Sequence, residues 1–273
     1  MGMLYISCRR MAAAALWISA TALPAAAAEP VVDQFTTPDR EWNLIVSPYV
    51  WAASLKGDAS LAGYDTDVDV PFSDIFKHLD LAAMGNIEVT NNLFGFYIDA
   101  QHVRTSQDES IAEHEIDVKI RTTLVSAGVY YRIYDQLLGG NTSFGEPRRF
   151  TIEPTVGVRW TKLEADVATG FGRADKYADW TDPFVGLRMS GDLSERWNLA
   201  GEADIGGFDI GSKLSINAQA YLGYRSQMFG RPAITRIGYR LLSQDYETRD
   251  FTGEKFRWDV VQHGPVLGFS LRF

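Results

Sequence analysis

The stretch FTIEPTVGVRWT, residues 150–161, alternates between two kinds of side chain along its whole length. Its apolar members are Ile152, Pro154, Val156, Val158 and Trp160, and its polar or small members are Thr151, Glu153, Thr155, Gly157 and Arg159. Because successive side chains of a β-strand point to opposite faces, this pattern predicts a strand with one oily face and one polar face.

The same alternation recurs after Trp42, in segments separated by turn-forming residues, and helical periodicity is nearly absent. We expect antiparallel strands near residues 43–55, 80–90, 93–105, 115–134, 149–164, 181–190, 197–208, 213–226, 232–246 and 257–273. Eight strands are an alternative, and twelve are another if residues 56–72 form a hairpin of their own. The expected outer loops are 56–79, 165–180 and 247–256, and the connection 135–148 is long for a periplasmic turn.

Two features favour a transmembrane β-barrel over a soluble β-sandwich, which also alternates. The polar faces carry full charges of both signs in mid-strand, as in a wet or salt-bridged lumen. Aromatic residues fall near strand ends, like the interfacial girdles of membrane barrels. These aromatic residues are Tyr49, Trp51, Tyr131, Trp160, Trp197, Tyr224 and Phe273. We therefore predict an all-β chain that closes into an antiparallel transmembrane barrel of about ten strands.

The C-terminal residues GFSLRF, 268–273, give the most specific signal. Phe273, Leu271 and Phe269 share one face of the last expected strand, next to Gly268. The segment resembles the terminal strand of bacterial outer-membrane proteins, although Val266 stands where that pattern usually has a polar residue. The resemblance implies recognition of Gly268, Phe269, Leu271 and Phe273 by the barrel-assembly machinery.

The N-terminus reads as an export signal. Arg9 and Arg10 precede an apolar run at residues 11–23, Pro24 ends it, and the small residues 25–28 offer a cleavage site. We expect a cleaved signal peptide at 1–28, a periplasmic segment at 29–41, a barrel at 42–273 and an outer-membrane location. Cleavage would remove the only cysteine and two arginines, changing the formal net charge from −9 to −11. Cysteine chemistry is thereby excluded, and nucleic acid is not an expected partner.

One short segment interrupts the β pattern. Residues 73–79 predict a single helical turn with Ser73 as its N-cap, which could be a lid, a lumen plug or a structured loop. Together with the opening segment PYVWA, 48–52, the stretch 72–81 resembles a group of uncharacterised proteobacterial outer-membrane β-barrel proteins. The resemblance covers most of the expected barrel and implies no catalytic residues.

A Gly-x-Arg element recurs at Gly157/Arg159, Gly186/Arg188, Gly223/Arg225 and Gly238/Arg240. By parity these arginines face inward, where acidic side chains are also expected. The predicted lumen charges are Glu88, Asp99, Glu153, Arg159, Asp182, Arg188, Glu202, Asp204, Arg225, Arg236 and Arg240. A structural salt-bridge network and an anion-selective or ligand-binding lumen are the two interpretations, and pairing is expected in both because an isolated buried charge is costly.

The histidines give little support to catalysis. Only His78, His102, His114 and His263 occur, no His-x-Ser pair is present, and His102 and His263 fall on lipid-facing positions. No cluster has metal-ligand spacing. We expect a protein without enzymatic activity, metal or other cofactor, with a structural or binding role or a narrow solute passage. An outer-membrane enzyme acting on lipid A, phospholipid or peptide is the alternative.

The expected surroundings are outer-membrane lipid and lipopolysaccharide, which acidic outer loops could meet through divalent cations. The sequence does not indicate an oligomeric state.

Overall fold

The computed structural model describes residues 41–61, 64–111, 114–169, 172–249 and 255–273. The expected segments 1–28 and 29–41 therefore lie almost entirely outside the described residues. The elements are β1 Asn43–Trp51, β2 Ser54–Leu61, β3 Tyr64–Val70, α1 Phe72–Lys77, β4 Leu79–Thr90, β5 Phe94–Ile111, β6 His114–Tyr131, β7 Tyr134–Asn141, β8 Pro147–Thr169, β9 Gly172–Asp192, β10 Trp197–Gly207, β11 Leu214–Met228, β12 Arg231–Arg249 and β13 Lys255–Arg272.

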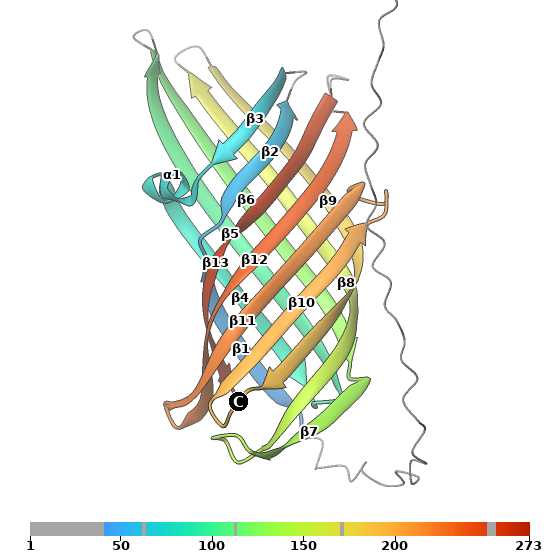
Figure 1. Ribbon diagram of the computed structural model, residues 1–273. Coiled ribbons are helices and arrows are strands. Elements are labelled where there is room, and N and C mark those ends of the chain that lie inside the picture. Colours follow the sequence, from blue (N-terminus) through green and yellow to red (C-terminus); the bar gives the residue numbers. More distant parts are fainter. Residues whose placement is uncertain (1–40, 62–63, 112–113, 170–171, 250–254) are drawn as a thin grey trace, which may run out of the picture. The chain divides into compact units, whose positions relative to one another are not determined.

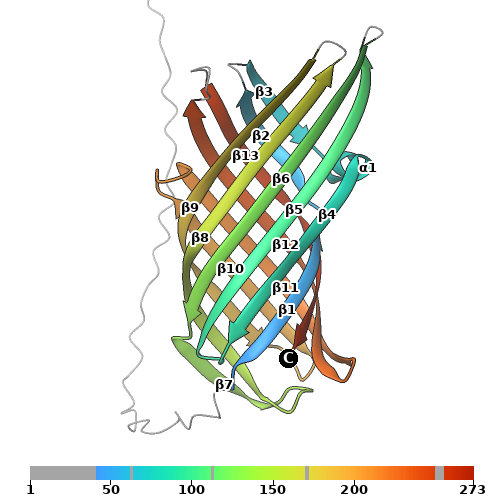
Figure 2. The ribbon, with the colours of Figure 1, turned by 180° about the vertical axis from the view of Figure 1, so that it is seen from behind.

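Ten of these strands close into an antiparallel barrel, which confirms the predicted fold (Figure 1, Figure 2). The order around the ring is β1, β4, β5, β6, β8, β9, β10, β11, β12 and β13, and β13 pairs back onto β1. Asn43 of β1 lies beside Thr90, the last residue of β4, and Phe273 exchanges backbone hydrogen bonds with Leu44. Both ends of the barrel chain therefore lie at one end, which is the periplasmic end in barrels of this class.

The expected outer loops are largely strand. β8 has 23 residues and β9 has 21, whereas about 9–11 residues suffice to cross a bilayer, so both strands extend beyond it through much of 165–180. β12 and β13 likewise shorten the expected loop 247–256. The segment 56–72 forms the hairpin β2–β3, but this hairpin continues β1 along β13 and adds no strand to the ring.

The long connection 135–148 also contains a strand. β7 pairs with the start of β8, so this part of the chain is a β-hairpin beyond the end of the barrel (Figure 1). Every residue of β7 is exposed, and Gly139 and Gly140 at its end have positive φ angles of 77° and 70°. Glycine adopts this left-handed backbone without a steric cost, which permits the irregularity in the pairing of β7 with β8 between Leu137 and Asn141.

The short helix α1 starts one residue earlier than expected. Pro71 is its N-cap residue, so Ser73 lies inside the helix and makes no cap hydrogen bond. None of its residues is buried, and both views place it at the margin of the barrel wall rather than inside the ring (Figure 1, Figure 2). Lys77 hydrogen-bonds Asp74 and lowers the pKa of that carboxyl. The helix is therefore not a lumen plug.

The wall changes its pairing beside α1. β1 pairs with β4 only as far as Pro48 opposite Gly85. Above this level β4 keeps its pairing with β5, and β2 pairs with β3. Proline has no N–H to continue the ladder, so Pro48 suits the point where the two strands part. Just above it, the backbone N–H of Trp51 donates to the thioether of Met84 at 3.3 Å.

The outward face of the barrel is an apolar belt. Its exposed side chains include Ile87, Ile98, Val156, Val185, Leu199, Ile205, Leu222, Ile237 and Leu267. Towards the outer end the same face becomes charged, with Arg104, Arg121, Lys162, Asp179, Asp245 and Asp259. A closed barrel with such a belt is the architecture of a membrane-spanning outer-membrane protein, which agrees with the predicted location. In the described part of the chain, no helix is long and apolar enough to span a membrane.

Two aromatic residues differ from the expected girdle. Tyr49 and Trp51 occupy inward positions of β1, and Trp51 is only 3% exposed. Tyr131, Trp197 and Phe273 are exposed at the periplasmic end, where a girdle residue belongs.

The belt predicts that position along a strand decides how well an added charge is tolerated. Val185→Arg places a guanidinium near the middle of the lipid-facing surface and should lower the free energy of unfolding by about 2–4 kcal/mol. Tyr177→Arg, on the same strand but above the belt, should cost about 0–1 kcal/mol. Urea titration of protein folded into liposomes measures both, and equal tolerance would contradict the assigned belt.

Candidate functional site

Arg159 is the centre of the barrel interior. It projects inward from β8, and its Nη2 donates to both carboxylate oxygens of Asp204 of β10, each at 2.8 Å. The two side chains are 2% and 1% exposed. Arg159 also donates to the hydroxyls of Ser126 and Ser215. A buried ion pair of this kind is tolerated because additional hydrogen bonds satisfy the remaining donors and acceptors.

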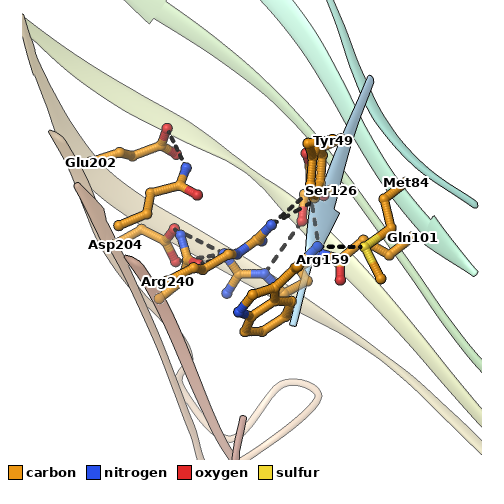
Figure 3. Close-up of polar contacts among 12 residues, drawn as sticks. Tyr49, Met84, Gln101, Ser126, Arg159, Glu202, Asp204 and Arg240 are labelled. Carbon is orange, nitrogen blue, oxygen red and sulfur yellow. Dashed lines mark hydrogen bonds and ion pairs between the residues drawn. The ribbon is translucent and has the colours of Figure 1, made fainter. Parts of the chain in front are cut away.

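The hydrogen bonds continue across the lumen from Asp204 (Figure 3). Asn217 of β11 donates to Asp204 and accepts from Arg240 of β12. Arg240 then donates to Asp99 of β5 and to the hydroxyl of Tyr49 of β1, both at 3.2 Å. We call this set the charged layer; it comprises Tyr49, Asp99, Ser126, Arg159, Asp204, Asn217 and Arg240. It joins strands on all sides of the ring.

An apolar cluster lies directly on the outer side of the charged layer. Trp51, Leu124, Leu242 and Val266 are 0–3% exposed and pack together, and Met84 packs against them. On β12, Leu242 is two residues beyond Arg240 towards the outer end, and Leu124 stands in the same relation to Ser126 on β6. Further out, Gln244 donates to Thr161, and the rings of Trp180 and Tyr246 stack at 4.2 Å. Side chains therefore fill the outer half of the lumen.

Arg188 lies in the periplasmic half of the lumen, between two tyrosine rings. Its guanidinium carbon lies 4.1 Å from the ring centre of Tyr130 and 5.5 Å from that of Tyr97. Its Nη2 is 3.1 Å from Glu88, which also accepts from the hydroxyl of Tyr130. Gly128 makes the close packing feasible, because a Cβ there would lie 2.7 Å from the ring of Tyr97.

A chamber of about 200 Å³ lies on the periplasmic side of the charged layer. Its wall includes Glu88, Glu153, Arg188, Glu202 and Arg236. Glu153 pairs with Arg132 at 2.9 Å. Serine hydroxyls, tyrosine rings and apolar atoms of β1, β9 and β13 form much of the remaining wall of the chamber. The chamber offers polar and charged groups to a molecule of small organic size.

The turn between β7 and β8 lies over the periplasmic opening of the barrel. Glu146 in this turn pairs with Arg272 of β13 at 2.6 Å, although β8 and β13 stand on opposite sides of the ring. The ring of Phe144 contacts the guanidinium groups of Arg225 and Arg272 at 5.9 and 5.8 Å. Ser143 donates its backbone N–H to the carbonyl of Glu195. We call residues 142–146 the mouth turn.

The structure places the predicted lumen charges in three groups. Arg159, Asp204, Arg240 and Asp99 belong to the charged layer, and Glu88, Glu153, Arg188, Glu202 and Arg236 line the chamber. The remaining two lie apart: Arg225 pairs with Asp192 near the periplasmic end, and Asp182 lies towards the outer end.

Two of these residues differ from the expected pairing of arginines with inward acids. Asp182 accepts from the backbone N–H of Ser212, because the loop after β10 folds inward over it. Among the described residues, Arg236 has no ion-pair partner, and its buried Nε has no hydrogen-bond acceptor.

Several polar partners were not among the predicted charges. Arg132 and Asp192 stand at strand ends, where the alternating pattern stops and parity no longer indicates a face. Asn217, Tyr49 and the serines are uncharged and carried no signal of their own. Their inward parity could have identified them as lumen residues, because each lies on the same face of its strand as a predicted charge.

The histidines in the described region lie away from the lumen charges. His102 hydrogen-bonds Thr123 across neighbouring strands, and His263 hydrogen-bonds the hydroxyl of Tyr239. The side chain of His114 is outside the described residues. No group of three acidic, histidine or cysteine side chains close enough to hold a metal ion occurs in the described part of the chain.

The residues of the expected assembly signal lie on the strand that closes the barrel. Leu271 stands opposite Val46 and Phe269 opposite Thr235, while Gly268 lies between Tyr49 and Arg236. Phe273 is 49% exposed at the periplasmic end. Recognition by the assembly machinery stays a prediction.

Comparison with known proteins finds structural likeness without close sequence similarity. No family model and no curated relative matches the chain. The attachment invasion locus protein Ail of Yersinia pestis is 13% identical, covers 85% of this chain and 98% of its own, and has a TM-score of 0.35. The outer membrane protease OmpT of Escherichia coli is 9% identical, covers 87% and 97%, and has a TM-score of 0.43. Neisserial surface protein A is 13% identical, covers 85% and 97%, and has a TM-score of 0.31. The fold assignment therefore rests on the strand pairing of this chain itself.

The burial of the Arg159–Asp204 pair leads to a stability prediction. Arg159→Ala leaves the carboxylate of Asp204 buried without its counter-charge and should cost about 3–5 kcal/mol. Arg104→Ala is the matched control, because it removes an ion pair with Asp80 whose side chains are 49% and 31% exposed, and should cost about 0–1 kcal/mol. Urea unfolding from liposomes measures both, and a loss below 1 kcal/mol for Arg159→Ala would mean that the layer is hydrated.

Proposed function

We propose that this protein is a closed outer-membrane barrel with a binding role and not a diffusion pore. The observation that carries the proposal is the charged layer, a chain of hydrogen bonds across the lumen from Ser126 to Asp99. The apolar cluster around Trp51 lies directly against this layer. A narrow passage for small solutes, the other expectation from the sequence, would have to cross both.

Crossing the charged layer would be energetically costly. A hydrated ion would have to separate Arg159 from Asp204, or Arg240 from Asp99, and leave two charges without partners in a dry interior. Barrels of about eight strands have interiors that side chains just fill, and the ten-strand lumen here is filled in its outer half in the same way. Among the layer's own side chains lies a cavity of about 30 Å³, with room for a water molecule or two.

The surroundings of the barrel follow from its outer surface. We propose that outer-membrane lipid covers the belt, that lipopolysaccharide meets the charged outer end, and that the assembly machinery binds the strand carrying Phe269 and Phe273. Asp65, Asp67 and Asp69 are exposed on one face of β3, where divalent cations could link them to lipid phosphates. His102 and His263 contact Thr123 and Tyr239 on the outward face of the wall, away from the chamber, and the role that we propose is not enzymatic.

Electrical recording tests the closed lumen. Protein refolded and inserted into planar lipid bilayers should give no steady conductance steps above those of the bare lipid, because the charged layer blocks ion passage. Insertion is checked in parallel by heat-modifiable mobility of the same preparation. Steady, reproducible conductance steps from folded protein would overturn the proposal.

A further inference from the structure

The chamber contains one cation and one carboxylate that stand out from its other charges. Arg236 has no ion-pair partner among the described residues, and its Nε is buried without an acceptor. Glu202 receives a hydrogen bond from Gln219 at 3.2 Å, and the Nε of Arg188 stays 4.0 Å away; both contacts are to the same oxygen, Oε2. In the part of the chain that the structure describes, Oε1 of Glu202 has no partner, so it can meet a molecule in the chamber.

The other charges of the chamber wall are already compensated. Glu88 is held by Arg188 and Tyr130, Glu153 by Arg132, and Asp99 by Arg240. The wall and these partners together hold equal numbers of carboxylates and guanidiniums. The chamber is therefore electrically neutral, but the two charges that complete the balance, Arg236 and Glu202, do not contact each other.

The charge balance restricts what the chamber can hold. An anion would pair with Arg236 but would add a net negative charge beside Glu202. A cation would pair with Glu202 but would add a net positive charge beside Arg236. Uncompensated charge is costly in a poorly hydrated interior. A molecule with both a carboxylate and an ammonium group compensates both residues and leaves the chamber neutral.

We propose that the chamber is a binding site for a small zwitterion of the amino-acid class. Arg236 receives its carboxylate, for which a guanidinium offers paired N–H donors, and Glu202 receives its ammonium group. The volume of about 200 Å³ suits a molecule of this size. The ligand enters from the periplasmic end, past the mouth turn, because the charged layer closes the other side. This inference rests on the proposed closed lumen.

Binding of matched ligands tests the assignment. Isothermal titration of the refolded full chain in lipid nanodiscs should show γ-aminobutyrate binding about ten- to a hundredfold more tightly than butyrate or butylammonium, since each of those makes only one charged contact. Glycine and β-alanine are run alongside to measure how the separation of the two charges affects affinity. Equal binding of zwitterion, anion and cation, or no binding of any zwitterion, would overturn the proposal.

Two variants separate the roles of the two residues. Arg236→Gln should reduce γ-aminobutyrate affinity to that of butylammonium, and Glu202→Gln should reduce it to that of butyrate. Arg104→Gln, at the outer rim, is the control and should bind as the original chain does. Unchanged affinity in both chamber variants would also overturn the assignment, and if either fails to fold, the three-ligand comparison on the original chain still decides.

Conductance of the same preparation distinguishes the two proposals. Zwitterion binding by a barrel that conducts would overturn the closed lumen and leave the site in place. A barrel that shows no conductance and binds no zwitterion would overturn the proposed binding site and leave the closed lumen in place.

Discussion

The buried ion pair between Arg159 and Asp204 is the interaction on which the interior depends. Asp204 also accepts from Asn217, Asn217 accepts from Arg240, and Arg240 donates to Asp99, so the position of each group is set by the one before it. In a low-dielectric interior such a network is strong when complete and costly when one member is missing. The layer therefore ties the strands together through their side chains, in addition to the backbone ladders, and separates the chamber from the outer half of the lumen.

The sequence predicted the barrel where one face of a strand meets lipid and the other meets the lumen. Residues 150–161 alternate for this reason, and the ten expected strands match the ten strands of the ring. Beyond the bilayer both faces meet water and the alternation disappears, so the extensions of β8 and β9 read as the loop 165–180. β7, with the sequence YDQLLGGN and every residue exposed, lacks the pattern for the same reason.

The lumen was less predictable because its contacts join strands that are distant in the ring. Parity indicates that Arg159 and Arg240 face inward, but partner choice depends on the tilt and register of the closed barrel. Parity along a strand therefore could not predict that Arg225 would pair with Asp192, or that Arg236 would lack an ion-pair partner among the described residues. Trp51 was expected in a girdle from its place near a strand end, yet it shares the inward parity of Tyr49 and belongs to the packed interior.

The pairing of β1 with β13 has a consequence for the time course of folding. Neighbouring strands such as β11 and β12 can pair as soon as both are present, but Ile45 must find Arg272, a contact between the two ends of the barrel chain. Contacts of such large sequence separation form slowly because loop-closure entropy opposes them. Until that step, two strand edges stay unpaired and are able to join a second chain, so aggregation competes with closure. A chain of this topology needs protection of its first strand for as long as its last strand is missing.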